Sequence, residues 1–259
     1  MKWLIFLVCA GVFEASEKKA EPRVVTRSLY SWFDQKAGDL VLKGNASIER
    51  DGVILRAEEI YYNEAKKEAF ATNQTRLESK EFNLEAGQLK VYLPGNRTFS
   101  QMLENDMVVI AQKAPRLTEK PGPDGAYSQI TAVEIKFFKA SEKVEAFENV
   151  RMLQLKNEGL TVVEEMVVTG AYLEYLHQQK KALVKQDVKL SSKELGAEGQ
   201  RLIYYQKDGR FYIVDDARVF QYDENGKVKD TVAGNKILHI LKEKRTILMG
   251  NVEGTLGPN

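Results

Sequence analysis

The chain has 259 residues, of which 43% are hydrophobic, and its 38 Lys and Arg residues nearly balance its 37 Asp and Glu residues. This hydrophobic content can supply a sizeable core and argues against wholesale disorder. A formal net charge of +1, without a basic stripe, argues against a nucleic-acid-binding protein. The length suits either one large all-β domain or two ordinary domains.

The N-terminus is typical of a secretory signal. A positive start, Met1-Lys2, precedes a short apolar run that ends at Phe13, and polar residues follow. A membrane-spanning helix needs about 20 apolar residues, so this run is too short to cross a bilayer comfortably. We therefore interpret residues 1–15 as a cleaved signal peptide and the chain as exported. The cleavage site stays open, and lipidation of Cys9 or an uncleaved anchor remain alternatives.

Regular patterning begins at Asp39, after a mixed polar segment, residues 16–38, that we interpret as a tether with one short strand near Val24 and Val25. From there, apolar and polar residues alternate in segments separated by Gly, Pro, Asn and Asp turns, as in antiparallel strands. The expected strands are 39–48, 53–62, 70–77, 84–93, 107–110, 130–138, 144–155, 160–176, 182–190, 200–205, 211–222, 228–241 and 246–256. Helix competes only over 158–177, where β-branched clusters favour strand.

One segment interrupts this regularity. Residues 113–129 contain Pro115, Pro121 and Pro123, and the pattern predicts a long Pro/Gly-rich loop there. The same strand pattern resumes after it, so we interpret the loop as an insertion at one rim of a single domain, residues 39–259.

A short motif recurs along the domain: a small residue, an aliphatic residue three positions later, and a bulky residue two positions after that. The copies are Ala57-Ile60-Tyr62, Ala86-Leu89-Val91, Ala132-Ile135-Phe137, Gly170-Leu173-Tyr175, Gly199-Leu202-Tyr204 and Gly234-Ile237-His239. A fixed motif with variable spacing predicts stacked β repeats with turns of variable length. We expect an all-β, repeat-built antiparallel protein with about a dozen or more strands and little helix. The small residue is expected to permit a bend or a close backbone approach.

No residue pattern favours an enzyme. His177 and His239 are the only histidines and lack a metal-ligand spacing, and Cys9 is the only cysteine. His239 occupies the bulky position of its repeat, so packing is the better interpretation of it. Asp215-Asp216 is interpreted as a turn rather than a catalytic carboxylate pair. The sequence therefore predicts no catalytic residue, no metal site and no cofactor.

Two copies of a further motif carry a resemblance to a known family. Leu42-Lys43-Gly44-Asn45-Ala46 and Leu248-Met249-Gly250-Asn251-Val252 resemble the L-x-G-N-V signature of the OstA-like family, which includes the protein LptA and the N-terminal domain of LptD. Arg56-Ala57-Glu58-Glu59-Ile60-Tyr61-Tyr62 resembles the A-x-x-[IL]-x-Y strand of that family. Degenerate copies of the Gly-Asn-Val corner are Glu148-Asn149-Val150, Gln186-Asp187-Val188 and Asp215-Asp216-Ala217. The resemblance covers residues 39–256, except for the 113–129 loop.

The resemblance implies a β-taco, or β-jellyroll, of two antiparallel sheets in the periplasm, which shields the acyl chains of lipopolysaccharide or a similar amphiphile. The groove candidates are Ile60, Tyr62, Leu89, Val91, Ile135, Phe137, Leu173, Tyr175, Leu202, Tyr204 and Ile237; the alternative is that they only pack against each other as a core. A non-ligand structural scaffold of the envelope is therefore the competing function.

The resemblance also implies pairing of strand edges between proteins. The implied partners are inner-membrane LptC-like proteins, outer-membrane LptD-like proteins, or further copies of the chain arranged head to tail. The edge candidates at the two ends of the repeat array are Leu42, Gly44, Ala46, Ile48, Leu248, Gly250 and Val252. Unpaired backbone groups at such edges are templates for a partner strand.

Overall fold

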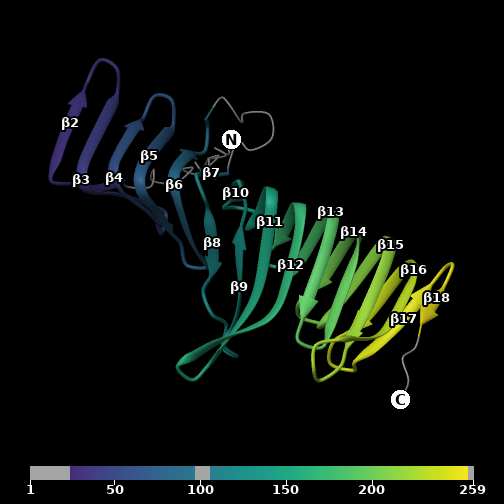
Figure 1. Cartoon of the computed structure of the whole chain (residues 1–259). Helices are drawn as coiled ribbons and strands as arrows, with labels where there is room; N and C mark the ends of the chain where they lie inside the picture. The colour runs from purple at the N-terminus through teal and green to yellow at the C-terminus, as the bar shows by residue number, and fades with distance from the viewer. Residues whose placement is uncertain (1–23, 97–105, 256–259) are drawn as a thin grey trace, which may run out of the picture.

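The computed structural model describes residues 24–96 and 106–255, where the chain forms strands and turns. The eighteen strands in these ranges are β1 (Val25–Arg27), β2 (Tyr30–Asp34), β3 (Asp39–Arg50), β4 (Val53–Asn63), β5 (Glu68–Glu78), β6 (Phe82–Tyr92), β7 (Val108–Gln112), β8 (Arg116–Glu119), β9 (Ala126–Thr131), β10 (Glu134–Phe138), β11 (Lys143–Glu158), β12 (Thr161–Leu176), β13 (Lys181–Ser192), β14 (Leu195–Tyr205), β15 (Arg210–Tyr222), β16 (Val228–Ile240), β17 (Arg245–Met249) and β18 (Glu253–Thr255). The strands pair antiparallel in one continuous array, which runs from β2 at one end to β17 and β18 at the other (Figure 1). The predicted all-β repeat fold is confirmed.

Within the described ranges, no helix is long and apolar enough to cross a membrane. The predicted signal peptide and Cys9 lie outside the described residues, so both stay predictions.

Every second strand of the array bends sharply at a pair of residues with left-handed backbone. The bends lie at Gly44-Asn45, Asn73-Gln74, Lys113-Ala114, Glu148-Asn149, Gln186-Asp187 and Asp215-Asp216, with φ between 48° and 76°. Gly, Asn and Asp tolerate this conformation better than other residues. Each bend shifts the pairing register with the next strand, as between Lys185 and Val188 of β13. The Gly-Asn-Val-like copies at 44–46, 148–150, 186–188 and 215–217 are therefore bends, whereas in the copy at 250–252 only Gly250 has left-handed backbone.

The small residue of the repeat motif lies on the strand that faces the bend. A Cβ atom on Gly199 would lie 2.5 Å from Ile213 Cγ2, and one on Gly170 would lie 2.6 Å from Val184 Cγ1. Neither distance is compatible with van der Waals contact. The close approach predicted for these two small residues is therefore confirmed.

The bends divide the array into two arms. The β10 arm contains β2, β7, β10, β17 and the segments of the long strands that pair with them; the β9 arm contains β1, β8, β9, β18 and the segments that pair with those. Opposite the bends, the free ends of the arms meet along a line that we call the seam. There, Lys139 of one arm end donates to the carbonyl oxygen of Asp51 of the other, at 2.7 Å.

The middle of the array is built differently from its ends. Between β6 and β11, two pairs of short strands replace long bent strands: β7 with β10 in one arm, and β8 with β9 in the other. The predicted long loop at 113–129 is therefore wrong, because Lys113-Ala114 is a bend and residues 116–119 and 126–131 are strands. The prolines lie outside the strands, because Pro115 follows the bend and Pro121 and Pro123 lie in the short turn after β8.

The predicted tether also needs correction. The short strand expected near Val24 and Val25 is β1, but β2 was not predicted, and the two strands pair with the two segments of β3 on either side of its bend. The array thus begins before Asp39, and β3 is an interior strand. Both strands are short, and most of their side chains are exposed, so their sequence lacks the buried alternation that marks the others.

Candidate functional site

The aliphatic position of the repeat motif forms a continuous row between the arms. Ile60, Leu89, Ile135, Leu173, Leu202 and Ile237 are all 0% exposed. They lie in the β10 arm, and side chains of the β9 arm, such as Leu84, Leu117 and Ile130, complete a single hydrophobic cluster with them. This inner row is what the period-2 alternation of each strand predicts for one buried sheet face.

The bulky position forms a second row, nearer the seam. Its members Tyr62, Val91, Phe137, Tyr175, Tyr204 and His239 are buried as well. His239 stacks on Phe211, with ring centroids 5.3 Å apart, and its Nδ1 lies 2.9 Å from the hydroxyl of Thr246. Burial lowers the pKa of His239. These contacts agree with the packing role expected for this histidine.

In the part of the chain that the structure describes, the side chains between the arms form one packed hydrophobic cluster. A hollow of only about 30 Å³ lies near the N-terminal end, among Ile48, Leu55, Leu77 and Val91. A larger hollow, of about 610 Å³, lies on the outer face of the β10 arm and is lined by aromatic residues that include Trp32, Tyr61 and Phe70. The structure thus places every groove candidate in the core, and their contact with a lipid stays a prediction.

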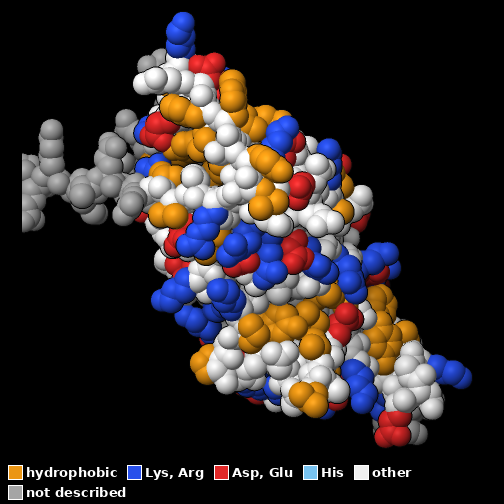
Figure 2. Space-filling view, turned by 90° about the vertical axis from the view of Figure 1, so that its left-hand side faces the viewer, with side chains coloured by type: hydrophobic (Ala, Val, Ile, Leu, Met, Phe, Trp, Pro, Cys, Tyr) orange, Lys and Arg blue, Asp and Glu red, His pale blue; other side chains and the backbone are white. Residues whose placement is uncertain are grey.

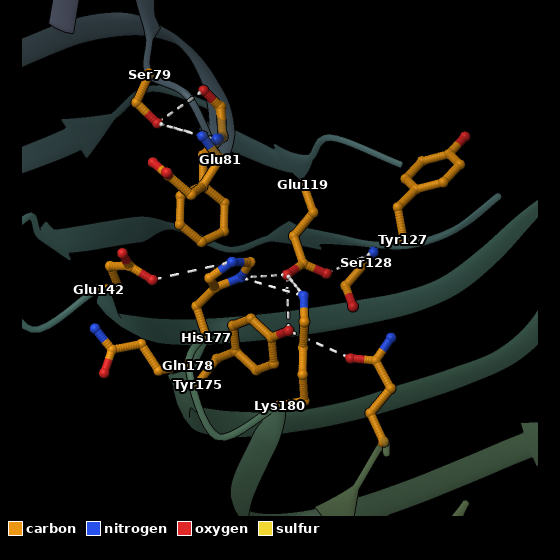
Figure 3. Close-up of polar contacts among 12 residues, drawn as sticks. Ser79, Glu81, Glu119, Tyr127, Ser128, Glu142, Tyr175, His177, Gln178 and Lys180 are labelled. Carbon is orange, nitrogen blue, oxygen red and sulfur yellow. Dashed lines mark hydrogen bonds and ion pairs between the residues drawn. The ribbon is translucent and has the colours of Figure 1, made fainter. Parts of the chain in front are cut away.

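A cluster of polar side chains, which the sequence did not reveal as a group, lies where the arms meet at the middle of the seam (Figure 3). Its centre is Glu119, at the end of β8, with a side chain only 2% exposed. Glu119 Oε1 accepts a hydrogen bond from the Tyr175 hydroxyl at 2.8 Å, and it lies 2.7 Å from His177 Nδ1 and 2.9 Å from Lys180 Nζ. Glu119 Oε2 accepts from the backbone N–H of Ser128 at 2.9 Å.

The charge of Glu119 is fully compensated in this position. Burial alone would raise the pKa of Glu119, but the hydrogen bonds from His177, Lys180 and Tyr175 and the charge of Lys180 outweigh it and hold the pKa at about 2. Burial and the neighbouring carboxylate raise the pKa of Tyr175. Glu119 is therefore ionised, and Tyr175 stays protonated as its donor.

The two ends of the array are free strand edges in the part of the chain that the structure describes. At the N-terminal end, β2 pairs with β3 alone and carries exposed aromatics, with Trp32 and Phe33 each 60% exposed. At the C-terminal end, β17 and β18 pair with β16 alone. Figure 2, which looks at the molecule from the side of β2, shows hydrophobic side chains gathered at that end and a belt of charged residues below them.

Of the predicted edge residues, only those near the C-terminus lie at an edge of the array. Leu248, Gly250 and Val252 lie in or beside β17 and β18, at the C-terminal edge, and their pairing with a partner stays a prediction. Leu42, Gly44, Ala46 and Ile48 do not lie at an edge, because β1 and β2 cover β3. The N-terminal edge consists instead of β2, which lies in the segment that the sequence predicts to be a tether.

Bent antiparallel strands around one apolar interior, with a free edge at each end, define the β-jellyroll class of the β-taco kind. The chain belongs to the LptA/(LptD N-terminal domain) LPS transport protein family, whose model matches residues 32–245. No curated protein matched the sequence.

Among solved structures, the chain is similar to LptH, the LptA homologous periplasmic component of the conserved lipopolysaccharide transport device from Pseudomonas aeruginosa. The alignment covers 91% of this chain and 96% of that chain, at 10% identity and a TM-score of 0.20. Because that TM-score is low, the fold assignment rests on the strand pairing and on the family match.

Proposed function

We propose that this protein is a periplasmic carrier of lipopolysaccharide or a related amphiphile, which holds acyl chains between its arms and leaves the sugar head group in water. The observation that carries the proposal is the inner row, an unbroken line of fully buried aliphatic side chains along a chain of the lipopolysaccharide-transport family. Such a row binds acyl chains without a specific polar site, since each buried methylene contributes about 0.8 kcal/mol.

Acyl chains enter this interior by replacing side-chain contacts rather than by filling an empty cavity, because the hollow between the arms is only about 30 Å³. The arms therefore separate at the seam when a chain binds. A head group that stays outside the seam keeps its phosphates hydrated and avoids the cost of burying charge.

The free edges of β2 and β17 supply the connection to partners. An incoming strand on either edge would extend the array and continue the apolar interior into the next protein. The partners proposed on this basis are an inner-membrane LptC-like protein, an outer-membrane LptD-like protein, or another copy of this chain.

Native mass spectrometry of the purified protein, incubated with lipopolysaccharide, tests the proposal. A matched sample receives the same lipopolysaccharide after removal of its acyl chains. We expect a stoichiometric adduct with the intact molecule and none with the deacylated saccharide. Equal adducts with both ligands would show that binding does not depend on the acyl chains, which would contradict the proposal.

The filled interior also favours a second function, a structural scaffold of the envelope without a ligand. Such a protein would need only a core and two edges that pair with its neighbours. A folded protein that forms no adduct with intact lipopolysaccharide at any ratio would support the scaffold and contradict the carrier.

A further inference from the structure

The polar cluster around Glu119 joins opposite arms. Glu119 and Ser128 belong to β8 and β9 of the β9 arm. Tyr175 is the last residue but one of β12, in the segment that belongs to the β10 arm, and His177 and Lys180 lie in the turn that follows β12. Figure 3 shows the side chains of both arms converging on the Glu119 carboxylate. Every contact of Glu119 with Tyr175, His177 or Lys180 therefore crosses the seam.

A second set of contacts extends the cluster into the next repeat. Gln206, in the turn after β14, donates to Gln154 Oε1 of β11 at 3.1 Å. Gln154 in turn donates to the carbonyl oxygen of Tyr127, and its Oε1 lies 3.4 Å from the hydroxyl of Ser128. Neutral and charged contacts thus form one connected bridge across the middle of the seam.

Burial distinguishes this bridge from the ion pair that joins the arms near the C-terminal end. Lys244 and Glu194 also belong to turns of opposite arms, with 2.8 Å between Lys244 Nζ and Glu194 Oε2, but their side chains are 72% and 64% exposed. Exposed pairs of this kind contribute little to stability. Removal of one partner from a buried pair is strongly destabilising, because it leaves an uncompensated charge.

The bridge lies over the inner row rather than within it. Leu117, two residues before Glu119, and Leu173, two residues before Tyr175, are both 0% exposed and belong to the hydrophobic cluster. Beneath the bridge, the apolar interior continues from the N-terminal to the C-terminal half. The bridge therefore closes the seam while leaving the row below it unbroken.

We propose that Glu119, with Tyr175, His177 and Lys180, is a latch that fastens the two arms at the middle of the seam and must open when an amphiphile passes. This rests on the proposed function. An amphiphile with its chains in the interior and its head group in water extends through the seam at every position along its path. It cannot move past Glu119 while the carboxylate is bonded across that line.

Two spin labels that flank the latch test this inference. Gln179 and Asp124 are exposed turn residues on the β10 and β9 arms, and nitroxides attached to cysteines there, in a Cys9→Ser background, report the distance across the seam. Pulsed double electron–electron resonance on the otherwise unchanged protein without lipid should give one narrow distance distribution. Glu119→Ala should add a longer population, whereas Glu194→Gln, which breaks the exposed pair with Lys244, should leave the distribution unchanged.

Lipopolysaccharide should produce the same longer population in the protein with an intact latch, at a ratio at which native mass spectrometry detects the complex. A complex that keeps the narrow distribution would overturn the latch, as would a folded Glu119→Ala protein with unchanged distances. If Glu119→Ala does not fold, Lys180→Met replaces it. That variant removes only the half-buried cation, so we expect a smaller fraction of molecules with the longer distance than Glu119→Ala would give. Unchanged distances in Lys180→Met would again overturn the latch.

Failure of the proposed function has a different signature. If no lipopolysaccharide complex forms, the carrier and the passage of an amphiphile are both overturned. The distances in Glu119→Ala would then still decide whether Glu119 holds the arms together.

Discussion

At the scale of single residues, each bend of the array depends on two consecutive residues with left-handed backbone. Gly44-Asn45 and Asp215-Asp216 carry residues that tolerate this conformation. Lys113-Ala114 adopts the same conformation without such a residue. Pairing of the strands on both sides imposes the bend there, so no local signal could have revealed it.

The small residues opposite the bends should be intolerant of even one added methyl group. Gly199 has no left-handed backbone, so Gly199→Ala tests packing alone; its Cβ would lie 2.5 Å from Ile213 Cγ2. We expect a loss of about 1–3 kcal/mol in the free energy of unfolding, measured in urea. Gly254→Ala is the control, since its nearest neighbour would lie at 3.4 Å. Equal stability of the two variants would contradict the close approach.

The Glu119 carboxylate should make stability depend on pH in the acid range. The pKa of Glu119 lies at about 2 in the folded protein, below the usual 4.5. Its contribution to the free energy of unfolding is therefore complete above pH 4.5 and is lost as the pH falls towards 2. That shift corresponds to about 3 kcal/mol. We expect Glu119→Gln to be less stable than the parent protein at pH 7. The difference in free energy of unfolding between the two proteins should disappear as the pH falls from 4.5 to 2.

Urea titrations of both proteins across this pH range would measure this difference. Glu194→Gln is the matched control at an exposed carboxylate and should differ little from the parent at any pH. A difference for Glu119→Gln that stays constant from pH 7 to 2.5 would show that the carboxylate is not held by the cluster.

At the scale of strands, alternation of apolar and polar residues located most of the array and failed at its edge. Long strands such as β13 and β15 have one buried face, which leaves a clear period of two. β2 has no buried residue in its five positions, so its sequence resembles a tether. Its strand conformation depends on pairing with β3, which sequence alone does not show.

The exposed aromatics of β2 should mark a surface that associates with another strand. Trp32→Lys puts a charge on this edge, and edge charges oppose strand pairing. We expect weaker self-association, or weaker binding of an LptD-like N-terminal domain, in sedimentation velocity. Leu160→Lys is the control, because Leu160 is fully exposed at the β11–β12 turn, away from either end of the array. An equal effect of both variants would argue against a role for the β2 edge.

At the scale of the whole molecule, the sequence predicted the class and the family but not the polar bridge. The repeat motif and the Gly-Asn-Val-like bends led to an all-β array, and the family match over residues 32–245 agrees with it. Glu119, His177 and Gln206 are far apart in the chain and belong to no repeat position, so only the folded arms bring them together. The inner row and the bridge above it together make the seam the part of the molecule on which the proposed carrier function depends.

Photocrosslinking at two neighbouring tyrosines tests most directly whether the interior holds lipid. Tyr204 lies between the arms and is buried, whereas Tyr205, the next residue of β14, lies on the outer face against Tyr212. Benzoylphenylalanine replaces each tyrosine in turn, and the protein is irradiated with lipopolysaccharide. We predict an adduct at position 204 and little or none at 205. Equal labelling at both positions, or labelling at 205 alone, would contradict a lipid-binding interior.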